Sequence, residues 1–301
     1  MRNKTSLFGK NLDLDLSHGN WNSWFEKESV HRKFLSARGL SQYYLSQLLK
    51  PQQSSLDKDN YIILSSGLLV GTRTPGATRT NIDSKNFFSN GVGSTNGGEF
   101  FAVALKYAGY GSIRITGKSK QPVYLLIDNE KVSLEKADEI WGKTTSQTVD
   151  ILRKKHGNDF HIACIGPAGE NLLRGACVML NKTRAAAKCG MGAILGSKKL
   201  KAIAVRGNRT PSIWDMEKFD KLIDIARKKV LDSGTAQRMS RWGAKSAVKA
   251  KNKVGSVPYM HFQDGFVDNL EGWDERAFLK YEVKRFGITN CPISCRQIYK
   301  I

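Results

Sequence analysis

The 301-residue chain carries 48 Lys and Arg against 27 Asp and Glu, a formal net charge of +21, and 40% of its residues are hydrophobic. Enough apolar material is present to bury a core, which excludes global disorder, and no apolar run approaches the roughly 18 residues that a membrane-spanning helix needs. The basic start has no apolar segment after it and the five cysteines are an odd number, so we expect a cytoplasmic protein without signal peptide or disulfide framework, of one or two domains.

The first part of the chain alternates between apolar runs and polar turns. Leu12, Leu14 and Leu16 alternate with acidic residues, which predicts a strand, and a turn follows at 17–20. Residues 81–98 are rich in Gly, Ser and Asn, so backbone conformation matters there more than side-chain packing. The apolar spacing further predicts a helix over 30–49, a strand over 61–64, and paired strands at 113–115 and 123–127.

The same pattern continues to Gly207 and then changes. It predicts a helix over 141–155, strands over 162–165 and 202–205, a turn at 166–169 and a glycine-containing stretch at 184–196. Beyond Gly207 an amphipathic helix is expected over 214–231, and no clear strand follows it. This order predicts an α+β fold: a β-rich N-terminal domain over 1–207, then the start of a mainly helical domain over 208–301.

The excess of positive charge raises the question of nucleic acid. The basic residues lie in separate short clusters, such as 198–201, 227–229 and 245–253, without zinc-finger spacing, an RNP-type motif or a helix-turn-helix. Solvated basic faces are the favoured interpretation, and nucleic acid is not expected as a partner. A small phosphate-bearing cofactor stays open, because buried phosphates attract Arg and Lys.

Two segments have the composition of a ligand site. Arg79 precedes a Thr-Asn-Gly-Gly run at 95–98, where paired glycines allow close approach of the backbone to a metal or phosphate. The stretch 184–193 places small residues between Arg184 and Lys188, which suits a crowded anionic cofactor. Glycine turns and Ala-rich helix starts are also common structural features, so the residues alone leave both interpretations open.

Four of the five cysteines divide into two kinds, and the fifth, Cys189, lies in the 184–193 stretch. Cys291 and Cys295 flank Pro-Ile-Ser, a spacing that can ligate zinc or an iron–sulfur cluster, although two thiolates cannot complete a four-ligand site. Cys164 and Cys177 stand in apolar, strand-like contexts, where buried structural thiols are expected.

Taken in order, these motifs resemble the aldehyde ferredoxin oxidoreductase family of tungsten-pterin enzymes, from Gly9 onward. The stretches that carry the resemblance are 66–72, Asn96 with Gly98, 105–110, 117–118, 122–124, 141–143, 165–172, 184–186, 190–198, 200–203, and 291–293 with Cys295.

The resemblance implies a β-rich base domain on which a tungsten bis-pterin cofactor lies, with molybdenum as the alternative metal and a magnesium ion bridging the pterin phosphates. It implies cofactor contacts at Arg79, Asn96, Gly98, Arg184, Ala185, Ala187 and Lys188, magnesium-binding backbone carbonyls at Asn96 and Ala185, and iron–sulfur ligands at Cys291 and Cys295. The implied reaction oxidises an aldehyde, or a related oxo or thioester substrate, and passes electrons through a 4Fe–4S cluster to ferredoxin or an electron-transfer subunit. A homo- or hetero-oligomer is expected.

The chain departs from the family pattern at three points. Ile288 stands where the family has a further cluster cysteine, which leaves open whether the cluster is absent, takes another ligand or has another nuclearity. Ala187 and Lys188 replace a glycine and an arginine, and lysine keeps the charge but loses the bidentate fork. Family members are roughly twice as long, so the acid–base residues are not identified and this chain alone is not expected to turn over an aldehyde. Three explanations stay open: a truncated or split gene, a partner chain that supplies the other half, or a non-catalytic cofactor-binding or assembly remnant.

Overall fold

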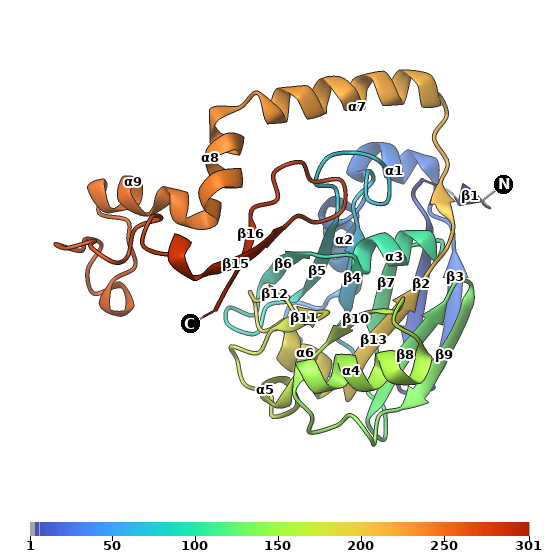
Figure 1. Ribbon diagram of the computed structural model, residues 1–301. Helices are drawn as coiled ribbons and strands as arrows, with labels where there is room; N and C mark the ends of the chain where they lie inside the picture. Colours follow the sequence, from blue (N-terminus) through green and yellow to red (C-terminus); the bar gives the residue numbers. More distant parts are fainter. Residues whose placement is uncertain (1–3, 6, 301) are drawn as a thin grey trace. The chain divides into compact units, whose positions relative to one another are not determined.

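In a computed structural model, which describes residues 4–5 and 7–300, the chain forms two compact units (Figure 1). Unit 1 takes in the described residues up to Thr72 together with Ala77–Trp214, and unit 2 takes in Arg73–Gly76 and residues from Asp215 onward. The predicted α+β class is confirmed: a β-rich N-terminal part is followed by helices. No helix among the described residues has the length and apolar character needed to span a bilayer.

Unit 1 is built on two six-stranded sheets. In spatial order the first sheet contains β3 (Asn20–Trp24), β2 (Lys10–Asp15), β7 (Tyr110–Thr116), β4 (Ile62–Ser66), β5 (Arg79–Lys85) and β6 (Val92–Gly98). The second contains β12 (Arg184–Ala186), β11 (Val178–Leu180), β10 (His161–Cys164), β13 (Leu200–Arg206), β8 (Val123–Asp128) and β9 (Lys131–Lys136). The pairs β2–β7 and β13–β8 are parallel, as is the short pair β1 (Lys4–Thr5) with β14 (Thr210–Pro211).

Helices cover every face of these sheets. α3 (Phe101–Tyr107) and α6 (Met191–Ser197) each contact strands of both sheets and lie between them, and every residue of α6 is buried. α2 (Arg38–Leu48) packs on the outer face of the first sheet, against Ile63, and α1 (Glu28–Phe34) precedes it. α4 (Thr145–His156) covers the outer face of the second sheet. β4 and β13 are buried at nearly every position, because both of their faces are covered.

Unit 2 consists of short helices and one hairpin. Its elements are α7 (Met216–Leu231), α8 (Gly234–Trp242), α9 (Val248–Lys253), the 3₁₀ helices η1 (Gly243–Ala247), η2 (Met260–Phe262) and η3 (Leu279–Tyr281), and the strands β15 (Glu282–Phe286) and β16 (Arg296–Tyr299). The Asp215 carboxylate accepts a hydrogen bond from the Lys218 amide, 2.9 Å away, and so caps α7. The hairpin corrects the expectation that no strand follows residue 231.

The predicted helix over 30–49 is two helices instead of one. α1 ends at Phe34 and α2 begins at Arg38, because Leu35 and Ala37 adopt positive φ angles of 59° and 48°. The backbone of Gly39 then passes so close to Phe34 that a Cβ at Gly39 would lie 2.4 Å from the Phe34 carbonyl oxygen. The apolar spacing continues across the break, so the sequence pattern did not indicate that the helix is interrupted.

The strands predicted at 113–115 and 123–127 exist but do not pair. β7 lies between β2 and β4 in the first sheet, whereas β8 lies between β13 and β9 in the second. The connection between them therefore crosses from one sheet to the other. The strands at 12–16, 61–64, 162–165 and 202–205 and the helices at 141–155 and 214–231 are confirmed within a few residues.

Candidate functional site

The β5–β6 hairpin brings three of the predicted site residues together. Its antiparallel register places Arg79 opposite Gly98 and Asn81 opposite Asn96, and residues in opposite positions share one face of the sheet. The Arg79 guanidinium donates a hydrogen bond to Asn96 Oδ1. The exposed end of the hairpin therefore carries a cation fixed by an amide side chain.

Helix α2 borders the same face of the hairpin. Arg38 Nε donates to Ser94 Oγ at 2.9 Å, and Gln42 Nε2 donates to Asp83 Oδ1, also at 2.9 Å. Asp83 is buried, and this burial raises the pKa of its carboxyl group. Arg38 was not among the predicted site residues, because it is distant in sequence from the hairpin and only the fold brings it beside Ser94.

The opposite face of β6 lies directly on the segment that contains the second predicted motif. A Cβ at Gly97 would lie 2.7 Å from Leu180 Cδ1 and 3.7 Å from the carbonyl oxygen of Ala185, and one at Gly93 would lie 2.9 Å from Cys189 Sγ. Side chains at these two positions would therefore push the segment away from β6. The glycines are required for this close approach.

Hydrogen bonds hold the same two segments together. The Lys188 amide donates to Thr95 Oγ1 at 3.1 Å, and Cys189 Sγ donates to the Ser94 carbonyl at 3.8 Å. Arg184 is half-buried in β12. The structure thus places all seven residues predicted for the cofactor on β5, on β6 or on the adjacent segment: Arg79, Asn96, Gly98, Arg184, Ala185, Ala187 and Lys188.

The residues present fit a phosphate-bearing cofactor with a hard cation. Arg79, Arg184 and Lys188 supply positive charge, and the backbone of β6 runs beside the Ala185 carbonyl, so oxygen ligands and cationic groups share one region. The hydroxyls of Thr78 and Thr80, on either side of Arg79, are buried without a hydrogen-bond partner in the described part of the chain. Unsatisfied buried hydroxyls are uncommon in folded proteins and here adjoin the predicted site.

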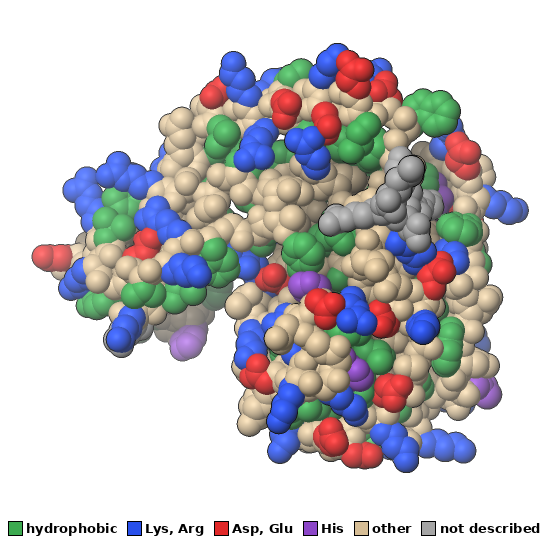
Figure 2. Space-filling view, turned by 45° about the vertical axis from the view of Figure 1, so that its right-hand side comes forward, with side chains coloured by type: hydrophobic (Ala, Val, Ile, Leu, Met, Phe, Trp, Pro, Cys, Tyr) green, Lys and Arg blue, Asp and Glu red, His purple; other side chains and the backbone are tan. Residues whose placement is uncertain are grey.

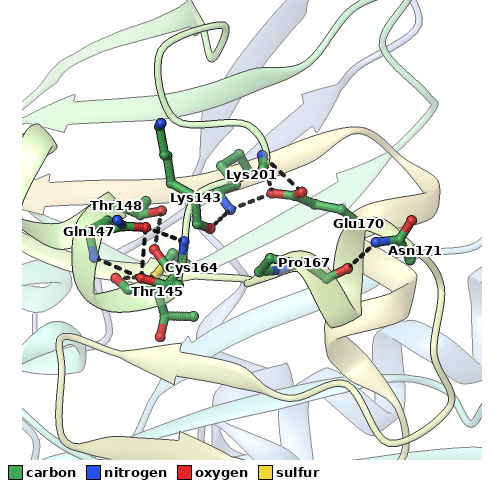
Figure 3. A network of polar contacts seen from close by, with 11 residues as sticks. Lys143, Thr145, Gln147, Thr148, Cys164, Pro167, Glu170, Asn171 and Lys201 are labelled. Carbon is green, nitrogen blue, oxygen red and sulfur yellow. Dashed lines mark hydrogen bonds and ion pairs between the residues drawn. The ribbon is translucent and has the colours of Figure 1, made fainter.

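Unit 1 also contains a buried ion pair, on the second sheet (Figure 3). Lys201 Nζ on β13 contacts Glu170 Oε1 and donates to the Lys143 carbonyl at 2.8 Å, and Glu170 accepts a hydrogen bond from the Gly142 amide at 2.9 Å. The two charged side chains are 0% and 6% exposed. The pair therefore fixes α5 (Pro167–Glu170) and the loop before α4 onto the second sheet.

Glycines let α6 pack backbone to backbone with its neighbours. A Cβ at Gly196 would lie 1.9 Å from the Gly169 carbonyl oxygen, and one at Gly192 would lie 2.5 Å from the Cys177 carbonyl oxygen. α6 begins at Met191, directly after the segment that contacts β6. The glycine pattern at 190–196 thus has a structural cause, and it fixes one end of the predicted cofactor loop.

Cys291 and Cys295 lie in unit 2, in the loop between β15 and β16, and both are half-buried. The Cys291 amide donates to the Ile288 carbonyl at 3.0 Å, so Ile288 belongs to the same turn as the first cysteine. No group of three or more His, Cys, Asp or Glu side chains that could hold a metal occurs among the described residues. The loop supplies two thiols, and the apolar Ile288 side chain in the same turn cannot ligate a metal.

Cys164 has the surroundings of a structural thiol. It is fully buried in β10, and its Sγ donates to the Thr145 carbonyl at 3.7 Å (Figure 3). Burial raises the pKa of the thiol to about 12, so it stays protonated near neutral pH. Cys177 is half-buried, at the start of the segment that leads into β11.

Family models match both parts of the chain. The model described as aldehyde ferredoxin oxidoreductase, N-terminal domain, matches residues 11–207. The model described as aldehyde ferredoxin oxidoreductase, domains 2 and 3, matches residues 221–301.

Individual proteins show the same relationship. The chain is 34% identical over 301 residues to a tungsten-containing aldehyde ferredoxin oxidoreductase of Thermococcus kodakarensis, covering 98% of this chain and 49% of the relative. It is 35% identical over 300 residues to the protein of that name from Pyrococcus furiosus, again covering 49% of the relative. It is 33% identical over 313 residues to the WOR-like subunit of an aliphatic sulfonate oxidoreductase of Pyrococcus furiosus.

A solved structure resembles the whole chain. The active-site complex BamBC of benzoyl coenzyme A reductase, in complex with 1,5-dienoyl-CoA, superposes with a TM-score of 0.84 at 26% identity. The match covers 100% of this chain and 48% of that one. The chain thus spans about half the length of the curated relatives and of the solved structure that it matches.

Proposed function

Because the chain belongs to the aldehyde ferredoxin oxidoreductase family, we propose that it is the pterin-binding part of a tungsten-dependent oxidoreductase. The observation that carries this proposal is the close packing of two distant segments, 79–98 and 184–189, through the glycines of β6 and the Lys188–Thr95 hydrogen bond. The tungsten-containing relatives support tungsten as the metal, with molybdenum as the alternative.

Each residue of the site has a distinct part in holding the cofactor. The guanidinium groups of Arg79 and Arg184 would bind phosphate oxygens, and Asn96 Oδ1 orients the first of them. The backbone carbonyls of Asn96 and Ala185 would hold magnesium, a hard cation that prefers oxygen ligands. Lys188 adds a positive charge, without the planar fork of an arginine, and its own amide ties the segment to Thr95.

The reaction proposed for the complete enzyme is oxidation of an aldehyde, or of a related oxo or thioester substrate, in the cytoplasm. A bound tungsten bis-pterin would supply the two-electron redox chemistry, and an iron–sulfur cluster would supply single-electron transfer toward ferredoxin or an electron-transfer subunit. Cys291 and Cys295 would hold part of that cluster. We propose that a further polypeptide segment or partner chain supplies the rest of the substrate site, in a homo- or hetero-oligomer.

A second function is favoured by Ile288 alone. An apolar side chain cannot ligate iron, so a chain with two cluster thiols fits a protein that binds or assembles the pterin cofactor without passing electrons onward. The two functions differ in metal content: the enzyme requires iron with tungsten, whereas the cofactor-binding protein retains tungsten and magnesium without iron.

The test is elemental analysis of the chain purified without oxygen from a host that makes the cofactor. We expect tungsten and magnesium in the parent protein and a loss of most tungsten in Arg79→Ala and Arg184→Ala, because each variant removes a phosphate-binding cation. Arg32→Ala is the control: this exposed arginine on α1 pairs with Glu28 and lies outside the site. Unchanged tungsten in both site variants, with unchanged melting temperature, would contradict the assignment.

A further inference from the structure

One stretch of unit 2 carries positive charge without any acidic residue of its own. From residue 233 to residue 263 the sequence contains Lys and Arg but no Asp or Glu. These cations lie on α8, η1 and α9, at Arg238, Arg241, Lys245, Lys249, Lys251 and Lys253. We call these residues the basic face. Figure 2 shows Lys and Arg side chains over this part of unit 2, at its left, with few acidic ones.

The basic face is mostly unneutralised. Lys249 pairs with Asp274 at 2.8 Å, and Lys245 packs on the rings of Phe278 and Tyr299. The other four members, Arg238, Arg241, Lys251 and Lys253, are exposed and form no ion pair with any described residue. Unpaired exposed charges of one sign create a potential that draws in and orients a partner of opposite charge.

The basic face adjoins the cysteine loop within the same unit. Arg285 of β15 donates from Nη1 to the Ser240 carbonyl of α8 at 2.7 Å, which ties the helix to the hairpin that carries the loop. A Cβ at Gly243, the first residue of η1, would lie 3.1 Å from the Cys295 carbonyl oxygen.

A cavity joins the two features. It has a volume of about 410 Å³, and its lining includes Arg241 of the basic face together with Pro292 and Ile293, which stand between the two cysteines. Arg241 of the basic face therefore lines one cavity together with the residues that separate the predicted cluster ligands.

We propose that the basic face is the docking surface for a small acidic electron-carrier protein. This inference rests on the proposed function, because the cysteine loop gives such a carrier a reason to dock there. Complexes of electron-transfer proteins bury little surface and depend on charge complementarity for fast, specific encounter. The exposed Arg241 beside the loop and Arg238 on the same helix, with Lys251 and Lys253 on α9, provide that complementarity without a deep apolar groove.

The test measures binding of the full chain to an immobilised acidic ferredoxin, the probe, at about 50 and about 200 mM NaCl. The double variant Arg238→Glu/Arg241→Glu reverses two exposed charges next to the loop. The matched control, Lys118→Glu/Lys154→Glu, makes the same charge change at exposed lysines of unit 1. We expect salt-sensitive binding by the parent, weakened about tenfold or more by the first variant and less than about twofold by the control. The variant Arg238→Lys/Arg241→Lys keeps the charge and should retain binding.

Three outcomes would overturn the docking surface: no binding by the parent, equal weakening by both double variants, or retained binding by Arg238→Glu/Arg241→Glu. A fourth outcome would also overturn it: the parent binds a 20-base-pair DNA duplex in a salt-sensitive way, and Arg238→Glu/Arg241→Glu abolishes DNA binding but not ferredoxin binding. That result would assign the basic face to nucleic acid. Tungsten content, measured on the same preparations, separates this inference from the proposed function. Normal tungsten without ferredoxin binding removes the docking surface and leaves the cofactor site intact.

Discussion

The two units of the chain bury their apolar residues to very different extents. Unit 1 closes a continuous core between its sheets and further clusters on their outer faces. In the described part of unit 2, the buried hydrophobic residues are Ile223 and Ala236, each 8% exposed, whereas Phe262 is 83% and Trp273 66% exposed. A compact domain normally covers most large apolar side chains, so unit 1 has the properties of a complete folding unit, whereas unit 2 leaves large apolar side chains exposed.

The largest expected effect tests how strongly unit 1 depends on its buried charges. Lys201→Met removes one partner of a pair that is almost inaccessible to water and leaves Glu170 buried without its counter-ion. We expect the free energy of unfolding to fall by about 3–5 kcal/mol, measured by urea denaturation. Lys154→Met, at an exposed lysine of α4, is the control and should change it by less than about 0.5 kcal/mol. A loss below about 1 kcal/mol for Lys201→Met would show that the pair is hydrated in solution.

A somewhat smaller loss of stability is expected from truncating a buried side chain of unit 1, and the same truncation in unit 2 gives a direct comparison of the two units. Leu125→Ala truncates a fully buried side chain of β8 and should lower the free energy of unfolding by about 2–5 kcal/mol. Phe262→Ala truncates an exposed ring of unit 2 and should lower it by less than about 0.5 kcal/mol. Thermal unfolding monitored by circular dichroism would measure the loss of stability in each of the two variants. Similar losses from both would mean that unit 2 is covered in solution, for example by a second copy of the chain.

The smallest effect concerns the pH dependence of unit 1. Lys106 is fully buried, and its ammonium group donates to the carbonyls of Leu7 and Phe8, at 2.7 and 3.2 Å. Desolvation lowers its pKa to about 7, and burial lowers the pKa of Lys198 likewise to about 7. Between pH 7 and the ordinary lysine pKa of 10.5 the unfolded chain therefore binds more protons than the folded one, so stability rises with pH.

Lys106→Met removes one of these two titrating groups. We expect the slope of unfolding free energy against pH, measured from pH 8 to 9, to fall by roughly 1 kcal/mol per pH unit. Lys154→Met again serves as the exposed control. An unchanged slope in Lys106→Met would mean that the Lys106 ammonium group keeps its charge in the folded core.

The sequence predicted a strand well where its apolar alternation is local. It predicted the pairing of strands poorly, because pairing depends on segments that are distant in sequence. Leu12, Leu14 and Leu16 alternate because β2 buries one face in the core, and that signal is local. The separation of β7 and β8 into different sheets depends on β2 and β13, which are far away in sequence, so adjacency along the chain was misleading. The β5–β6 hairpin has no clear apolar alternation, because glycines form the face of β6 that contacts the neighbouring segment.

The candidate site was predicted by resemblance more than by chemistry. Arg79 and Arg184 stood out as cations beside small residues, but nothing in either motif indicated that the two segments pack against each other. The contact of Arg38 with Ser94 gave no signal at all, because it depends on how α2 crosses the hairpin. Ile288, in contrast, was informative from the sequence alone, since a missing thiol needs no structure to be recognised.

The close contact of β6 with the 184–189 segment bears on the thermodynamics of cofactor capture. Gly93 and Gly97 let the segment lie against the strand, and the Lys188–Thr95 hydrogen bond holds it there. A loop ordered in this way before a ligand arrives loses little conformational entropy on binding, so more of the contact energy remains as affinity. Replacing either glycine with a larger residue would therefore weaken retention of the cofactor through preorganisation, even with every charged group still in place.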